Sequence, residues 1–597
     1  MIAAGITAAA IVLPWLILLP LHGVAAALAH GFTLVAAFHG AGLVVARLAD
    51  QRNASPLLIV QWGVAALIGL SGIAIAAQAG TLALHAALVF GFAAVHTGCV
   101  GARFAHYSGR VEAGVTPPRS WLVPTALLAV LGTLAVLGAA GASLPRPFDD
   151  EGHVLAQVRR VLDTGALGDP VGYPRRAQLG AQIALSALAS GAHEDGPRLV
   201  DALALALALA LALTRIRPRD PGAALWASVL VVAAFALALA PTDPLPCWPA
   251  VGLILALHAM LDEAAPPPLA LAITAGALIA LRYELAPVGA VMVLAAWWRR
   301  RGDHRNTTAL LGGALAVVAP FVVARAIAWR SVPAIAASVL GPPPQAPVAV
   351  RLLVAAAIAV PAAFVLRLAL PERRLRTAAT ATAAALGAIA AHLTAAGLYS
   401  QRLAWPIAIA FAITLVIELV RSRWSGPSAL ITLLVLCLII YEGREAPGRL
   451  RWSHRVEASA SDIDALRCPA GEDADPYRGI LARIPAGATV AVWVTEPQRL
   501  DYVRHRIIDL RVPAGAHLRE RRTAHPSRLV ALLAQLSAAY LLVESDRTHA
   551  DAAEGSRLSR FICGLPLASC TDELEAVVQG HHVVSENRGV RLVDLRR

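Results

Sequence analysis

The feature that most constrains this chain is the recurrence of apolar runs near the length that spans a bilayer. Such runs follow one another from Ile2 to about Tyr441, separated by short stretches that hold charge, Gly or Pro. Of the 597 residues, 57% are hydrophobic and 15% are charged, whereas a soluble protein of this length needs more charge to cover its surface. The sequence therefore predicts a polytopic α-helical membrane protein.

The apolar runs and their breakers predict about fifteen membrane spans. The expected spans cover residues 2–20, 23–46, 57–78, 82–104, 121–142, 199–214, 222–240, 249–261, 268–281, 285–298, 308–329, 348–370, 376–398, 403–420 and 427–441. The stretch Asp201–Leu213 alternates like a strand, but in lipid only a helix satisfies its own backbone, so we expect a helix there. The first run lacks a preceding basic region and another run follows at once, which indicates a retained span rather than a signal peptide.

Arginine sets the expected orientation, because every one of the 51 basic residues is arginine. With these spans, the arginine-rich loops all fall on one side, which the positive-inside rule makes the cytoplasm. Those loops carry Arg47 and Arg52; Arg103, Arg110 and Arg119; Arg215, Arg217 and Arg219; Arg299, Arg300, Arg301 and Arg305; Arg373, Arg374 and Arg376; Arg421 and Arg423. The N-terminus is then cytoplasmic, and residues 143–198 and 442–597 are extracytoplasmic. We assign the net charge of +12 to this topology in a cell's inner (cytoplasmic) membrane and expect no nucleic-acid partner.

Residues 442–597 differ in character, being charged and containing short strand and helix patterns. Strands are expected at 488–494, 538–545, 582–587 and 590–595, and helices at 527–536 and 571–578, with Asn587-Arg588-Gly589 as a hairpin turn. The sequence predicts a small extracytoplasmic α/β domain here. Cys563 and Cys570 are close enough in sequence to pair if their side of the membrane is oxidising.

The stretch RPFDDEGHVLAQVRRVLDTGALGDP, residues 146–170, places three neighbouring carboxylates directly after an apolar run. The residues that follow have helical period, with an apolar face at Val154, Leu155, Val158, Val161 and Leu162. The opposite face holds His153, Gln157, Arg160 and Thr164, and Gly165 ends the helix. An amphipathic helix beside a span usually lies flat in the membrane interface.

Two explanations account for Asp149, Asp150 and Glu151 at the start of this helix. One is capping, because an Asp side chain accepts orphan backbone N–H groups and acids suit the positive end of the helix dipole. The other is catalysis: neighbouring carboxylates repel, so at least one gains proton affinity, as suits a general base at the water–lipid boundary. The two explanations are compatible, since one Asp can cap while its neighbour reacts.

This segment resembles the first outer loop of GT-C integral-membrane glycosyltransferases, in which an acidic pair is followed about fifteen residues later by Gly; Asp150 and Gly165 match it. YSQRLAWPIAIAF (399–411) is similar to a late span entry of the family, with Arg402 and Pro406 in place but Leu403 where Tyr is usual. LRYELAP (281–287) is similar to the outer end of a middle span. The resemblance covers 121–441 and extends to enzymes of the dolichyl-phosphate-mannose–protein mannosyltransferase type; the four spans in 1–120 fall outside it.

The resemblance implies transfer of a sugar from a polyprenyl-phosphate donor to an acceptor hydroxyl of a lipid, glycan or protein on the outer face. It implies that Asp150 or Asp149, with Glu151 beside them, acts as base. Physically, the departing lipid phosphate needs cations, and the arginines expected outside the cytoplasm are Arg175, Arg176, Arg282 and Arg402. The plain alternative for each arginine is snorkelling to the interface or a lipid-headgroup contact.

His153, Tyr283 and Glu284 are further polar neighbours of these groups, with a local hydrogen bond favoured over metal binding for His153 and neutralisation of Arg282 open for Glu284. The six cysteines have no metal-binding spacing, and we expect neither a metal nor a cofactor. Three other classes stay open: a secondary transporter, an O-antigen ligase or polymerase, and a non-catalytic scaffold. The expected concentration of ionisable residues at the outer rim, without a visible repeat, favours the glycosyltransferase over the transporter.

Overall fold

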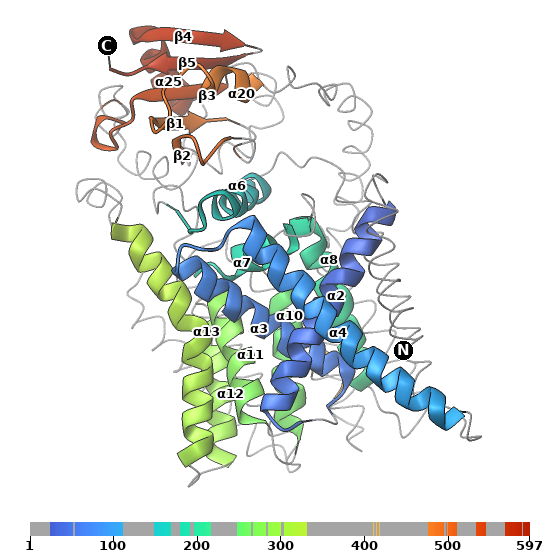
Figure 1. Ribbon diagram of the computed structural model, residues 1–597. Helices are drawn as coiled ribbons and strands as arrows, with labels where there is room; N and C mark the ends of the chain where they lie inside the picture. Colours follow the sequence, from blue (N-terminus) through green and yellow to red (C-terminus); the bar gives the residue numbers. More distant parts are fainter. Residues whose placement is uncertain are drawn as a thin grey trace, which may run out of the picture.

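A computed structural model shows a helical bundle with a small α/β domain at one end (Figure 1). The structure describes residues 24–51, 54–111, 149–168, 179–190, 196–215, 247–263, 267–281, 285–299, 304–330, 410, 413–414, 417, 476–494, 497, 500–509, 530, 533–544, 568–587 and 589–596.

The bundle is formed by long apolar helices that share one hydrophobic core. These helices are α2 (Val24–Leu48), α3 (Pro56–Ala76), α4 (Leu82–Val111), α7 (Ala181–Ser190), α8 (Gly196–Arg215), α10 (Cys247–Asp262), α11 (Pro268–Leu281), α12 (Ala286–Arg299) and α13 (His304–Arg330). Each helix that falls on an expected span confirms helical structure there. The remaining expected spans, 2–20, 121–142, 222–240, 348–370, 376–398 and 427–441, lie outside the described residues, as does nearly all of 403–420.

Four helices in the described part of the chain are long and apolar enough to cross a bilayer: Ala29–Leu48, Pro56–Ala76, Leu82–Ala102 and Asn306–Ala328. Shorter apolar helices accompany them at Ala181–Ser190, Leu203–Arg215, Trp248–Asp262, Pro268–Leu281 and Val288–Trp297. The alternating stretch that follows Asp201 belongs to α8, as its expected membrane setting requires.

Helix α3 runs through the centre of the bundle. Its start is set by Ser55, whose hydroxyl accepts from the Leu58 N–H at 3.3 Å, and by Pro56 in the first turn. Two glycines let neighbouring helices approach α3 closely. A Cβ on Gly63 would lie 1.6 Å from the Phe38 carbonyl oxygen, and one on Gly72 would lie 2.6 Å from the Phe321 ring. Because Phe38 belongs to α2 and Phe321 to α13, helices on both sides of residue 120 pack into one body.

Two helices are described in the segment between α4 and α8, within residues 149–168 and 179–190. Helix α6 (Asp149–Thr164) is the amphipathic helix expected from the sequence, and Gly165 follows it with φ +78°, a left-handed conformation suited to glycine. Helix α7 has no counterpart among the expected elements, and all ten of its residues are buried in the bundle. The segment 143–198 is therefore more than a surface loop, since part of it packs inside the helical core.

The described residues of the C-terminal domain form a five-stranded mixed sheet of order β2-β1-β3-β5-β4. Its strands are β1 (Thr489–Trp493), β2 (Arg506–Asp509), β3 (Tyr540–Glu544), β4 (His582–Asn587) and β5 (Val590–Asp594). Strands β2, β1 and β3 are parallel, whereas β5 is antiparallel to both β3 and β4. The two-residue connection between β4 and β5 ends at Gly589, with φ +77°, as the expected hairpin turn requires.

Alternate side chains of the sheet supply two cores, one on each face. Val490 of β1 packs with helix α20 (Pro476–Leu481), and Ala491 packs on the other face with helix α25 (Ala568–Gly580). The predicted α/β character and the strands β1, β3, β4 and β5 are confirmed. Strand β2 and helix α20 were not expected, because each is too short to show a periodic pattern.

Candidate functional site

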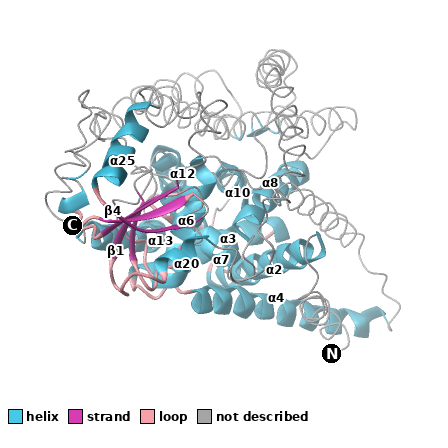
Figure 2. Cartoon of the chain, turned by 90° about the horizontal axis from the view of Figure 1, so that it is seen from above, coloured by secondary structure: helices cyan, strands magenta, loops and turns pink. Residues whose placement is uncertain are grey.

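Helix α6 lies between the bundle and the sheet domain (Figure 1). Seen from above, the strands and α6 overlie helices of the bundle such as α3 and α13, which agrees with the side view (Figure 2). The helix that begins with the three acids thus lies at the end of the bundle that carries the α/β domain.

The bundle side of α6 is apolar and closely packed. Val158 and Val161 are 3% and 0% exposed and belong to the bundle's hydrophobic core. Just beyond the helix, the Gly165 carbonyl accepts a 3.0 Å hydrogen bond from the Gly80 N–H in the α3–α4 connection. A Cβ on Gly165 would lie 2.3 Å from the Gln78 carbonyl oxygen, so only glycine fits this contact.

The opposite side of α6 meets the C-terminal domain through Arg160. Its Nη2 donates to the Ile507 carbonyl of β2, and its guanidinium carbon lies 4.9 Å from the centre of the Tyr502 ring. The backbone N–H of Arg506 donates to the Ala488 carbonyl, so the backbone N–H and C=O of Arg506 face β1. Backbone groups alternate along a strand, so those of the next residue, Ile507, point away from β1. Arg160 therefore covers part of the open edge of β2, where an unpaired carbonyl would otherwise stand.

Arg160 is only 6% exposed, yet within the described part of the chain its contacts are to neutral groups. Its Nη1 is buried and has no hydrogen-bond partner among the described residues. Gly168 gives the side chain room, since a Cβ there would lie 2.1 Å from the Arg160 Cδ. Burying a cation without a carboxylate partner costs desolvation free energy that an apolar residue at the same position would not cost.

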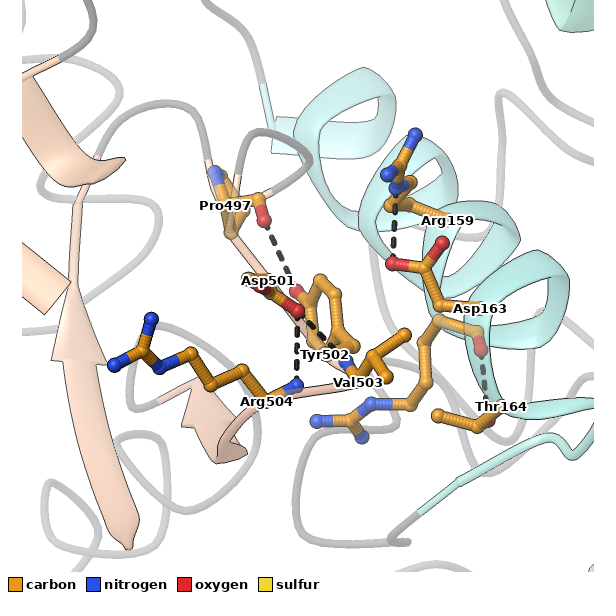
Figure 3. A network of polar contacts seen from close by, with 9 residues as sticks. Arg159, Asp163, Thr164, Pro497, Asp501, Tyr502, Val503 and Arg504 are labelled. Atoms are coloured by element: carbon orange, nitrogen blue, oxygen red, sulfur yellow. Dashed lines mark hydrogen bonds and ion pairs between the residues drawn. The ribbon is translucent and has the colours of Figure 1, made fainter. Parts of the chain in front are cut away.

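Asp163, one turn further along α6, belongs to the same contact region (Figure 3). It forms a 2.9 Å ion pair with Arg159, and its carboxylate accepts from the Tyr502 backbone N–H. Burial raises the pKa of the Asp163 carboxyl above its usual value; Arg159 and the Tyr502 N–H oppose this rise, and the nearby Asp501 charge adds to it.

The facing loop of the C-terminal domain is shaped by its own hydrogen bonds. The Asp501 carboxylate accepts from the backbone N–H groups of Val503 and Arg504 at 3.0 and 2.9 Å, and the Tyr502 hydroxyl donates to the Pro497 carbonyl at 3.1 Å (Figure 3). These bonds hold the Tyr502 ring and N–H toward α6.

His505 follows in this loop and is 2% exposed. Neither ring nitrogen makes a hydrogen bond of good geometry within the described residues. Burial lowers the pKa of His505 and the Arg504 charge lowers it further, against smaller opposing effects of Asp501 and the Leu481 carbonyl.

The predicted site residues are described only in part. Asp149, Asp150, Glu151 and His153 lie at the start of α6, where the structure describes the helical backbone but not these side chains. The predicted phosphate-binding arginines and their neighbours, Arg175, Arg176, Arg282, Tyr283, Glu284 and Arg402, lie outside the described residues, as does Cys563. Within the described part of the chain, no three His, Cys, Asp or Glu side chains are placed to hold a metal ion.

Sequence reasoning missed the contact between α6 and the C-terminal domain. It placed Gln157 and Arg160 on the polar face of α6, whereas both are buried, 5% and 6% exposed. No local pattern signalled this contact, because Arg160 and Ile507 are 347 positions apart in the sequence.

A second polar group lies at another point of the bundle, where α8 and α10 both end. Arg215 Nη2 pairs with the Asp262 carboxylate at 2.9 Å, and Arg215 Nη1 lies 3.0 Å from His258 Nδ1. Arg215 is 7% exposed. This arginine thus has an anionic and an imidazole partner inside the bundle.

Histidines also meet within the long helices. His39 of α2 and His96 of α4 lie with their Nδ1 atoms 2.8 Å apart and their rings edge to face. His85 Nε2 lies 2.7 Å from the Ser71 hydroxyl of α3. Ionisable groups inside an apolar helical bundle are uncommon and are often functional.

In comparisons with known proteins, no protein-family model matches the chain, and no curated protein is similar to it at a significant level.

Proposed function

We propose that this protein is a membrane-bound glycosyltransferase of the GT-C type that uses a polyprenyl-phosphate sugar. The observation that carries the proposal is the position of α6: a helix that begins with three acids lies between an apolar bundle and the α/β domain. A donor with a lipid tail and a sugar headgroup presents its reacting carbon at such a boundary. The motif that α6 contains, from Asp150 to Gly165, is the part of the sequence that resembles the family.

In the proposed reaction, Asp150 or Asp149 accepts the proton of an acceptor hydroxyl. The hydroxyl oxygen forms a bond to C1 of the sugar while the bond from C1 to the phosphate oxygen breaks, and polyprenyl phosphate leaves with its electron pair. The dipole of α6 stabilises the carboxylates at its N-terminus, and Glu151 raises the proton affinity of its neighbours by repulsion. Arg175, Arg176, Arg282 or Arg402 would bind the departing phosphate.

The proposal places the reaction on the extracytoplasmic face of the cytoplasmic membrane, with the N-terminus in the cytoplasm. Two contacts support the underlying topology. The α3–α4 connection and the end of α6, both expected outside, meet at Gly80 and Gly165. Arg215 and Asp262, both at expected cytoplasmic ends of helices, form an ion pair.

Amide variants of the two aspartates test the proposal. Transfer from polyprenyl-phosphate sugars should fall by about 100-fold or more in the double variant and in the single variant that removes the base, Asp150→Asn or Asp149→Asn, because the base is lost while the helix is retained. Glu575→Gln, an exposed carboxyl-to-amide change on α25, is the matched control. Full activity of all three aspartate variants would reject the base assignment.

A cellular experiment tests the donor class. Cells that lack the protein should accumulate lipid-linked sugars, identified by mass spectrometry of the extracted lipids, and wild-type protein should reverse the accumulation. An unchanged amount of lipid-linked sugars would contradict the use of such a donor and would favour a polymerase, a ligase or a scaffold.

The second candidate is a secondary transporter, and the His39–His96 contact favours it. Two histidines sharing a hydrogen bond between spanning helices can take up and release a proton. Reconstituted vesicles distinguish the two functions: a transporter moves protons with its substrate and loses this flux in His96→Phe, whereas a glycosyltransferase retains transfer in that variant.

A further inference from the structure

We propose that Arg160 is a positioning residue, through which the C-terminal domain sets the orientation of the acid-bearing helix α6. This inference rests on the proposed function for its catalytic consequence, whereas the contact itself is independent of it. The C-terminal domain would then be part of the catalytic unit rather than an appended domain.

The first step is that Arg160 joins two parts of the chain far apart in sequence. Its donor bond goes to Ile507 and its guanidinium lies over Tyr502, so both of these contacts are to the C-terminal domain. Its neighbour Arg159 has a side chain that is 50% exposed and pairs within α6. Of two adjacent arginines on one helix, the buried one contacts the domain.

The second step is that α6 is held from two sides near its C-terminal end. Gly165 contacts the α3–α4 connection through Gly80 and Gln78, while Arg160 and Asp163 contact the facing loop of the C-terminal domain. Removing the contacts of one side leaves the helix held from the other side alone, so its tilt is less constrained.

The third step is the distance to the acids. Asp150 and Arg160 share one helix, and a rise of about 1.5 Å per residue separates them by about 15 Å along its axis. A tilt of about 10° at Arg160 therefore moves the acidic end by roughly 3 Å. Because a misplacement of about 1 Å can lower a rate on the order of 100-fold, a modest loosening at Arg160 should be visible in catalysis.

The charge of Arg160 supports this assignment. The side chain is buried against a carbonyl and an aromatic ring, with Nη1 unsatisfied among the described residues. Apolar packing alone would be better served by leucine or methionine. The planar guanidinium, however, can donate along the edge of β2 and stack on Tyr502 at once, which fixes direction as well as distance.

The test compares the intact, membrane-embedded protein with Arg160→Ala, Arg160→Lys and Tyr502→Leu, and uses Arg159→Ala as the matched control. We expect Arg160→Ala and Tyr502→Leu to lower kcat at least about tenfold while KM for the donor changes less than about threefold, because the base is misplaced and donor binding is retained. Arg160→Lys should be intermediate, since it keeps a donor for Ile507 but loses the planar stack. Arg159→Ala should stay within about twofold of wild type.

Amide hydrogen exchange on the same proteins gives a readout that does not require activity. Arg160→Ala should accelerate exchange about tenfold or more in both 149–164 and 500–509, and Arg159→Ala should not. A fall in kcat with unchanged exchange, or faster exchange with unchanged kcat, would overturn the positioning role. If Asp149→Asn, Asp150→Asn and the double variant all prove fully active, the base assignment fails, and the exchange result alone still decides whether Arg160 fixes α6.

Discussion

Two buried arginines lie in different parts of this molecule and are satisfied in different ways. Arg215, at the ends of α8 and α10, has a carboxylate and an imidazole as partners. Arg160, on α6, contacts a carbonyl and an aromatic ring. Their exposures are nearly equal, 7% and 6%, so burial alone does not distinguish them.

The difference is what each arginine connects. Arg215 and both of its partners belong to bundle helices, so its charge is neutralised within the bundle. Arg160 reaches from a helix on the bundle to the edge of a separate sheet, where its bonds hold only while the two parts stay docked. Removing the partner of a neutralised buried cation destabilises the fold, whereas removing a cation at a domain contact loosens the parts that it joins.

The largest effect on stability should come from breaking the Arg215 pair. Asp262→Ala leaves a buried guanidinium without its carboxylate and should lower the free energy of unfolding by about 3 kcal/mol. Thermal unfolding of purified protein in detergent measures this. Glu575→Ala, which removes an exposed carboxylate on α25, is the control. Equal melting temperatures for the two variants would show that Arg215 does not depend on Asp262.

The bundle-side support of α6 should be nearly as sensitive. In Gly165→Ala the new methyl requires a left-handed backbone and would lie 2.3 Å from the Gln78 carbonyl oxygen, so stability should fall by about 2 kcal/mol. The matched control is Gly91→Ala on α4, where a Cβ meets no described atom within 4 Å. An equally stable Gly165→Ala would mean that the α6 contact with the α3–α4 connection can shift without cost.

The stability contributed by the buried His505 of the C-terminal domain should fall in mild acid. Because folding lowers the pKa of His505, the unfolded chain binds the proton more readily. The contribution of His505 is therefore complete above the unfolded pKa of 6.5 and is lost as the pH falls below it.

Thermal unfolding at pH 7.5 and 5.5 tests this dependence, and we expect a smaller effect than that of Gly165→Ala. The pH-dependent loss should shrink in His505→Leu and persist in His582→Gln, since His582 is exposed. The same loss in all three proteins would assign it to other groups.

The smallest effect should come from the exposed arginine next to Arg160. Arg159→Ala removes an i,i+4 pair whose arginine is 50% exposed, so stability should fall by about 0.3–0.5 kcal/mol. Measuring Arg159→Ala and Arg160→Ala side by side sharpens the comparison, since the two changes remove the same charge one residue apart. Similar losses would show that burial at Arg160 has no energetic weight.

The sequence by itself determined the elements whose pattern is local. Apolar runs predicted α2, α3, α4 and α13, because a span must satisfy its backbone within one segment. The period of residues 154–162 and the following Gly165 predicted α6, and alternation with turn residues predicted β4 and β5. Each of these patterns lies within a short stretch of the chain, so it predicts its element without knowledge of the segments that pack against it.

Only the tertiary structure decided which surfaces meet. Gln157 and Arg160 carry the polar pattern of a solvated face, yet both are buried, and Arg160 lies against the edge of β2. Helix α7 carries no span-length run, yet neighbouring helices bury it completely. Burial and pairing of this kind depend on residues such as Ile507, 347 positions from Arg160, and no local pattern encodes such a contact.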